Sequence, residues 1–136
     1  MSETLDKIEK TDAEWRAQLS DLAYEVTRRK GTERPGSNED FPPGPGIFAC
    51  VCCGAALFDV ADRYESGSGW PSFRRAISEG AVAEREDDTL FVRRIEALCA
   101  RCDAHLGHVF TDGPPPSGLR FCMNGAALTF EGRESA

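Results

Sequence analysis

Six cysteines are the residues of this 136-residue chain whose spacing most suggests chemistry. Four of them form two C-x-x-C pairs, Cys50 with Cys53 and Cys99 with Cys102. Two intervening residues let one turn direct both sulfurs at the same cation, and Gly54 permits the tight backbone that follows the first pair. Four thiolates would close a tetrahedral shell. The spacing therefore predicts a structural Zn²⁺ site that clamps two distant parts of the chain together.

Spacing alone leaves alternatives to this metal site open. Buried free thiols or a redox-active C-x-x-C would use the same residues. Cys52 is a spare thiol in the first cluster, so that Cys50 could pair with Cys52 instead of Cys53. Two matched pairs are a stronger signal for zinc than one pair would be, and we favour Cys53 over Cys52 as the ligand.

The sixth cysteine, Cys122, lies far from both pairs, late in an apolar run that is typical of a strand. Alternation along a strand puts Arg120, Cys122 and Asn124 on one face. A cation and an amide donor beside a thiol favour the thiolate, which is the reactive form. Cys122 is therefore a candidate nucleophile, and an inert buried thiol is the ordinary alternative.

Both histidines of the chain, His105 and His108, fall in one short stretch that is followed by Asp112. Imidazole titrates near neutral pH, so one or both could supply protons near Cys122. A purely structural role is the alternative, and we expect it for at least one of them.

Trp70 is a third candidate, because it lies on a stiff turn between Gly69 and Pro71. A large aromatic side chain on a constrained loop often forms the wall of a ligand site. A tryptophan that plugs the core would fit the sequence about as well.

The elements that must position these residues begin with a helical lead over residues 1–30. Thr11 and Glu14 have capping-box spacing, and a second short helix should start at Ser20 or Asp21 and end near Lys30. Three apolar residues recur at helical intervals and should pack on the body of the domain: Trp15, Leu19 and Leu22.

The rest of the chain reads as β structure after a Pro- and Gly-rich wrapping segment over residues 31–46. Short apolar runs separated by turn residues are the candidate strands: 47–50, 56–60, 81–83, 90–98, 108–110, 119–123 and 126–130. This pattern predicts one mainly β domain over residues 1–136, an antiparallel sandwich or barrel-like body at 47–130 with short N-terminal helices.

Composition limits the partners and the compartment. The formal net charge is −7, from 16 Lys and Arg against 23 Asp and Glu, and no basic stripe is present, so nucleic acid is not expected as a partner. The charged first ten residues do not form a signal peptide, and no apolar run is long enough to span a membrane. We therefore expect a cytoplasmic protein, whose cysteines are metal ligands or reactive thiols rather than disulfides.

Together these motifs resemble the methionine sulfoxide reductase B family over residues 11–130. The segments that carry the resemblance are Cys50-x-x-Cys53-Gly54, Ser66-Gly67-x-Gly69-Trp70-Pro71-Ser72-Phe73, Cys99-x-x-Cys102, His105-Leu106-Gly107-His108-Val109-Phe110 and Arg120-Phe121-Cys122-x-Asn124.

The resemblance implies a zinc-clamped fold of two antiparallel sheets and reduction of the R epimer of methionine sulfoxide. It implies Cys122 as nucleophile and Trp70, with Phe110 beside it, as the wall that receives the substrate. Further residues implied to complete the pocket are His105, His108, Asp112, Arg120 and Asn124. The zinc ligands implied are Cys50, Cys53, Cys99 and Cys102.

The sequence departs from part of this family at Ser68, where many members have a cysteine that resolves the oxidised nucleophile. We therefore expect one catalytic cysteine and an external thiol reductant such as thioredoxin. The resemblance implies protein-bound, or else free, methionine sulfoxide as substrate, and the lack of an apolar heptad or obvious surface patch predicts a monomer. Two rival functions account for part of these residues: a zinc-structured binding module without catalysis, and a hydrolase built from Cys122, His108 and Asn124.

Overall fold

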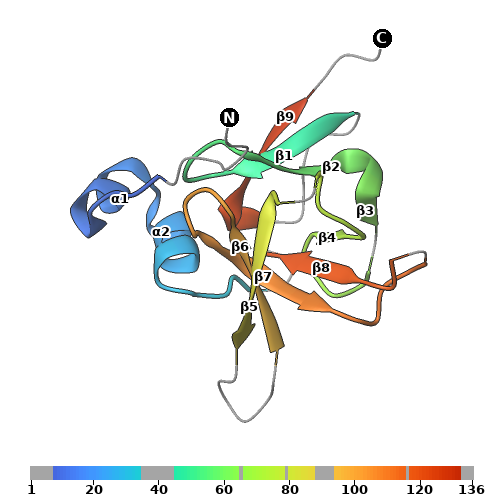
Figure 1. Cartoon of the computed structure of the whole chain (residues 1–136). Coiled ribbons are helices and arrows are strands. Elements are labelled where there is room, and N and C mark those ends of the chain that lie inside the picture. Colours follow the sequence, from blue (N-terminus) through green and yellow to red (C-terminus); the bar gives the residue numbers. More distant parts are fainter. Residues whose placement is uncertain are drawn as a thin grey trace, which may run out of the picture.

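The computed structural model describes residues 8–34, 45–64, 66–78, 80–87, 94–115 and 117–132. Predictions for residues 1–7, for most of the 31–46 segment and for the start of the 90–98 strand fall outside these ranges. Within them the chain is mainly β, with two antiparallel sheets and two short N-terminal helices (Figure 1). The predicted fold class is confirmed.

The two helices are α1 (Asp12–Gln18) and α2 (Asp21–Arg28). The predicted capping box is present at α1, where the Thr11 hydroxyl accepts a hydrogen bond from the Glu14 amide and the Glu14 carboxylate accepts one from the Thr11 amide. Such reciprocal bonds satisfy two backbone donors that the helix itself cannot. They explain why so short a helix begins where it does.

One part of the predicted helical stripe is wrong. Trp15 and Leu19 are buried, but Leu22 is 45% exposed. The chain leaves the helix at Leu19 and restarts at the Ser20 cap, so the helical phase is reset between the two segments. The second helix instead buries a different set: Ala23, Tyr24, Val26 and Thr27.

The strands of the described residues form one sheet of three and one of six. The order in the smaller sheet is β2 (Ala56–Asp59), β1 (Gly46–Cys50) and β9 (Leu128–Gly132). The order in the larger sheet is β3 (Arg63–Tyr64), β4 (Ser72–Phe73), β8 (Arg120–Met123), β7 (His105–Phe110), β6 (Arg94–Cys99) and β5 (Val82–Asp87). The described residues also form the short 3₁₀ turns η1 (Val60–Asp62) and η3 (Gly125–Ala127). The predicted 126–130 strand therefore starts two residues late, because η3 occupies its beginning.

Four phenylalanines join the two sheets. Phe48 and Phe58 come from the smaller sheet, and Phe73 and Phe121 from the larger one. The rings of Phe58 and Phe73 stack at 4.3 Å between centroids, and Phe48 meets Phe73 at 5.1 Å. Phe58 also meets Phe121 edge-on at 5.8 Å. Aromatic pairs at these distances anchor β8, the strand that carries Cys122, to the core.

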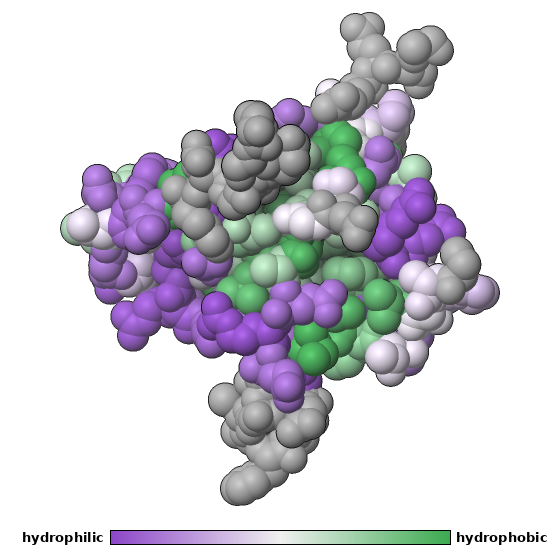
Figure 2. Space-filling model, viewed as in Figure 1, coloured by the Kyte–Doolittle hydropathy of each residue, from purple (hydrophilic) through white to green (hydrophobic). Residues whose placement is uncertain are grey.

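The helices carry a large hydrophilic part of the surface in one view of the molecule (Figure 2). Figure 2 shows hydrophilic side chains over the side of the molecule that α1 and α2 occupy, and hydrophobic side chains over the middle of the sheets. Neither helix of the described residues has the length and apolar character needed to cross a bilayer.

Candidate active site and metal centre

The two C-x-x-C pairs fold into matching turns. The Gly54 amide donates to the Cys50 carbonyl over 2.8 Å, and the Asp103 amide donates to the Cys99 carbonyl over 2.8 Å. Gly54 and Asp103 both have positive φ, of 79° and 62°. Glycine takes this conformation without strain, whereas aspartate is one of the few other residues that tolerate it. The second turn thus has the same conformation as the first, with Asp103 at the position of Gly54. An aspartate there gives no signal of a turn in the sequence.

The sulfurs of Cys50, Cys53, Cys99 and Cys102 all lie within 4.8 Å of one another. The Cys50 and Cys102 sulfurs are 3.6 Å apart, as are those of Cys53 and Cys99. Zn–S bonds of about 2.3 Å in a tetrahedron would separate the sulfurs by about 3.8 Å. The cluster therefore has the size and shape of a four-thiolate metal site.

Cys52 takes no part in this cluster of sulfurs. Its side chain turns toward α2, where the thiol donates to the Thr27 hydroxyl over 3.4 Å. The structure thus resolves the ambiguity in the first pair in favour of Cys53. The helices also dock on the turns themselves, because Gln18 donates to the Cys52 carbonyl and Arg28 to the Cys102 carbonyl.

Cys122 lies in a separate cavity of about 360 Å³. The lining includes five of the other candidate residues: Trp70, His108, Phe110, Arg120 and Asn124. Sheet register explains why His108 lies in the same cavity as Cys122, because His108 on β7 is directly opposite Cys122 on β8. Directly opposed residues of an antiparallel pair project from the same face with their Cβ atoms about 5 Å apart.

Close packing of β7 on β8 depends on Gly107. A Cβ atom at this position would lie 2.1 Å from the Cys122 carbonyl oxygen. The glycine that interrupts the His105–Phe110 run in the sequence thus marks a close approach of two backbones. Its presence keeps His108 beside Cys122.

Burial raises the pKa of the Cys122 thiol, and the Ser68 hydroxyl and the Arg120 guanidinium partly oppose that rise. The Ser68 oxygen lies 4.0 Å from the Cys122 sulfur. Ser68 belongs to a chain of hydroxyls, since Ser66 contacts both Ser68 and Ser72 at 2.8 Å. A hydroxyl and a cation therefore lie where they can stabilise the Cys122 thiolate when it forms.

Asp112 acts on this site through Arg120. The exposed Asp112 carboxylate accepts two hydrogen bonds from Arg120, at 2.9 and 3.3 Å, which lower the pKa of that carboxyl. The guanidinium also lies 4.4 Å from the centre of the Phe110 ring. These two contacts hold the Arg120 side chain at the cavity wall.

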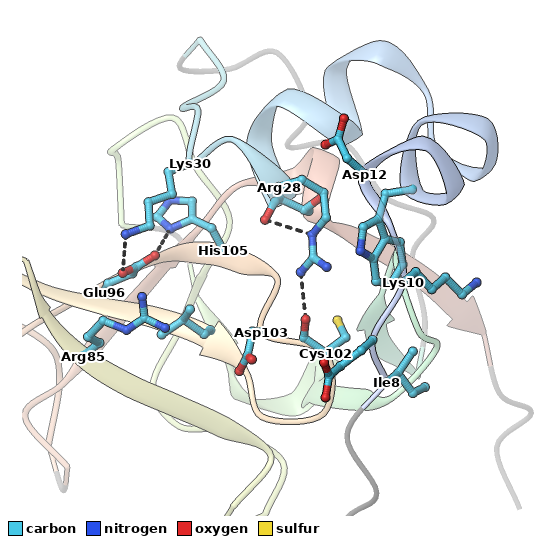
Figure 3. A pocket seen from close by; sticks show the side chains of 14 residues that line it. Ile8, Lys10, Asp12, Arg28, Lys30, Arg85, Glu96, Cys102, Asp103 and His105 are labelled. Atoms are coloured by element: carbon cyan, nitrogen blue, oxygen red, sulfur yellow. Dashed lines mark hydrogen bonds and ion pairs between the residues drawn. The ribbon is translucent and has the colours of Figure 1, made fainter.

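His105 lies behind the cavity. Its Nδ1 is 2.7 Å from the Glu96 carboxylate, whose other oxygen lies 3.4 Å from the Lys30 ammonium, as Figure 3 shows. Its ring meets that of His108 at 5.5 Å between centroids. Burial holds the pKa of His105 below its ordinary value despite the Glu96 carboxylate. The tautomer with hydrogen on Nδ1 would donate it to Glu96. His105 supports His108 from behind.

Two residues of this region escaped the sequence reasoning. Glu96 and Glu33 are 1% and 3% exposed, respectively. Glu96 interrupts an apolar strand, and an acidic residue at such a position is a signal of a buried partner. Glu33 lies in an irregular segment whose sequence carries no comparable signal.

The reactivity of Cys122 gives a first test of these electrostatics. We expect its alkylation by iodoacetamide to accelerate with rising pH around a midpoint above that of an exposed cysteine. Ser68→Ala should slow the reaction at neutral pH about fivefold, if the lost hydrogen bond to the thiolate is worth about 1 kcal/mol. Rates would be followed by peptide mass spectrometry, with the exposed Ser78→Ala as control. A midpoint below that of an exposed thiol would contradict this description of the site.

Comparison with known proteins places the chain among proteins of similar length. The family described as the SelR domain matches residues 19–132. A peptide methionine sulfoxide reductase MsrB of Hahella chejuensis is 50% identical over 127 residues, which cover 93% of this chain and 91% of that relative. The protein of the same name from Azotobacter vinelandii is 48% identical over 131 residues, covering 96% and 98% of the two chains.

Proposed function

Because the chain belongs to the methionine sulfoxide reductase B family, we propose that it reduces the R epimer of methionine sulfoxide with Cys122 as the nucleophile. The observation that carries this proposal is the cavity in which Cys122, His108 and Trp70 line one volume. A thiol, an imidazole and an aromatic wall are the three groups that the chemistry requires.

The first step transfers the sulfoxide oxygen to Cys122. The Cys122 sulfur attacks the sulfoxide sulfur while His108 takes the thiol proton and delivers it to the oxygen. The S–H bond of Cys122 breaks as the S–S and O–H bonds form. The hydroxyl then passes to the Cys122 sulfur, so that the S–O bond of the substrate and the S–S bond break, a sulfenic acid is left on Cys122 and methionine leaves. Trp70 and Phe110 enclose the substrate's methylthio end, and Arg120 stabilises the thiolate.

An external thiol completes the cycle. One reductant thiol displaces water from the sulfenic acid to form a mixed disulfide, and a second thiol releases Cys122 and leaves the reductant as a disulfide. Ser68 stands near Cys122 where a resolving cysteine would be needed, and Cys52 faces Thr27 in another part of the fold. We propose thioredoxin or a similar dithiol as reductant, oxidised proteins as substrates, and a monomeric enzyme of protein repair.

The four-cysteine cluster is proposed to hold a structural Zn²⁺. Its four thiolates leave no position for a substrate, and the cluster is separate from the Cys122 cavity. The metal would supply stability and take no part in the reaction.

An epimer-resolved assay tests the function. Purified protein, dithiothreitol and a peptide that carries both sulfoxide epimers would be incubated and analysed by chiral chromatography. We expect the R epimer alone to disappear. Consumption of the S epimer would reject the proposed specificity for the R epimer. Consumption of neither epimer by folded, metal-loaded protein would reject the enzymatic function and favour a zinc-held binding module.

The same assay without reductant tests the resolution step. We expect one methionine per chain and a sulfenic acid at Cys122 that dimedone traps. Formation of a Cys52–Cys122 disulfide instead would show that the chain resolves its own nucleophile.

A further inference from the structure

Glu33 lies between the helical lead and the catalytic cavity without lining that cavity. It follows α2 after a short irregular segment, and 3% of its surface is exposed. Its backbone and its carboxylate both bond to groups next to Cys122. A buried acidic residue with so many bonds to one site calls for an account of its role.

The carboxylate of Glu33 caps the turn that follows β8. Its two oxygens accept hydrogen bonds from the amides of Gly125 and Ala126, each over 2.8 Å. Asn124 occupies the cap position of this turn but makes no side-chain capping bond. Glu33 supplies that bond from a distant part of the sequence, and charge-assisted bonds of this kind are strong. The turn, and with it the end of β8, is tied to residue 33.

The backbone amide of Glu33 orients the Asn124 side chain. It donates to the Asn124 Oδ1 over 3.0 Å, while the Asn124 Nδ2 donates to the Leu106 carbonyl over 3.1 Å. An amide group has one acceptor end and one donor end, so this pair of bonds allows only one orientation of it. The second Nδ2–H remains for a substrate oxygen in the cavity that Asn124 lines.

The carbonyl of Glu33 anchors the Trp70 indole. Trp70 Nε1 donates to it over 3.1 Å. The loop that carries Trp70 contains Gly67 and Gly69, both at positive φ. Within this loop Ser68 and Ser72 bond to the Trp70 backbone, whereas the Glu33 carbonyl bonds to the indole itself.

We propose that Glu33 is a positioning residue for the reaction, one that holds Trp70 and Asn124 as a single unit around Cys122. This inference rests on the proposed function. Glu33 touches neither substrate nor thiol; it sets where the aromatic wall and the amide donor stand. Loss of the carboxylate releases the Gly125 and Ala126 amides. It thereby loosens the two bonds of the Glu33 backbone, to the Asn124 side chain and to the Trp70 indole.

The test uses Glu33→Ala and Glu33→Gln, with the exposed Glu25→Gln as the matched control. In a Trp15→Phe background Trp70 is the remaining tryptophan, so its fluorescence reports on the indole directly. We expect acrylamide to quench Trp70 more in Glu33→Ala than in wild type. We also expect kcat/KM for the sulfoxide peptide to fall about 10- to 100-fold, mostly through KM, because small displacements of binding groups have effects of this size. Glu33→Gln keeps one acceptor oxygen, so its quenching and its kcat/KM should lie between those of wild type and Glu33→Ala.

Hydrogen exchange covers the case in which Glu33→Ala does not fold. The indole N–H of Trp70 in wild-type protein should exchange slowly, because it bonds to the carbonyl of a buried residue. Fast exchange, or folded Glu33→Ala with unchanged quenching and KM, would overturn the proposal. If wild type reduced no sulfoxide while quenching still rose in Glu33→Ala, the proposed function would fail and the positioning of Trp70 by Glu33 would stand.

Discussion

Cys122→Ser is expected to lower sulfoxide reduction by at least about 10³-fold, the scale seen when a catalytic nucleophile is removed. A serine hydroxyl is a poor nucleophile toward sulfur. It also cannot accept the substrate oxygen, as the cysteine sulfur does when it becomes a sulfenic acid. Cys122 is only half-buried, so an oxygen in place of sulfur should leave the fold intact. The measurement is the rate of R-sulfoxide loss at saturating reductant.

Two controls separate loss of chemistry from loss of structure. Cys52→Ser removes a cysteine of the same chain that faces Thr27, and it should keep most of the activity. Cys122→Ser itself should still bind the sulfoxide peptide, because Trp70, His108 and Asn124 remain around the cavity. Activity of Cys122→Ser within tenfold of wild type would exclude Cys122 as the nucleophile.

Local spacing was enough to predict that Cys50, Cys53, Cys99 and Cys102 come together. The C-x-x-C turns are determined by backbone geometry within a few residues, and both appear as expected. The direction of the Cys52 side chain was not predictable in this way, because it depends on Thr27 of α2, which is distant in sequence. Whether Cys52 or Cys53 joins Cys50 in the cluster therefore depends on a tertiary contact and not on local spacing.

Strand limits were predicted less well where glycine or a turn interrupts an apolar run. The 108–110 prediction was too short, since β7 begins at His105 and includes Gly107. Glycine weakens a strand in isolation, but here it permits the close approach of β8. The two-residue strands β3 and β4 were missed, because pairing across the sheet defines them rather than any local pattern.

Residues that support the site from behind were the hardest to predict. His105 was expected at the pocket, yet its ring bonds to Glu96 and backs His108. No sequence pattern indicated Glu33, although it bonds both to the Trp70 indole and to the Gly125 amide. Their roles follow from contacts between segments far apart in sequence, which periodicity and motif spacing do not encode.

Removal of a metal ligand is expected to have the second large effect. Cys50 ends β1 in the smaller sheet and Cys99 ends β6 in the larger one, so a bound ion would join the two sheets. The helices dock on the same turns through Gln18 and Arg28. Structural zinc contributes about 10–16 kcal/mol in small domains, whereas the whole free energy of unfolding is commonly about 5–15 kcal/mol. Cys99→Ser should therefore lose the metal and unfold.

Metal analysis and circular dichroism together test this expectation. Wild type and Cys52→Ser should contain one zinc per chain and melt cooperatively, whereas Cys99→Ser should contain little metal and show no cooperative transition. A strong chelator should convert wild type to the same state, because the ligands come from both sheets and the fold depends on their joint attachment. If Cys99→Ser kept one zinc per chain and an unchanged melting temperature, the cluster would not be the clamp between the sheets. The stability of the domain would then have to come from its hydrophobic core, to which Phe48, Phe58, Phe73 and Phe121 belong.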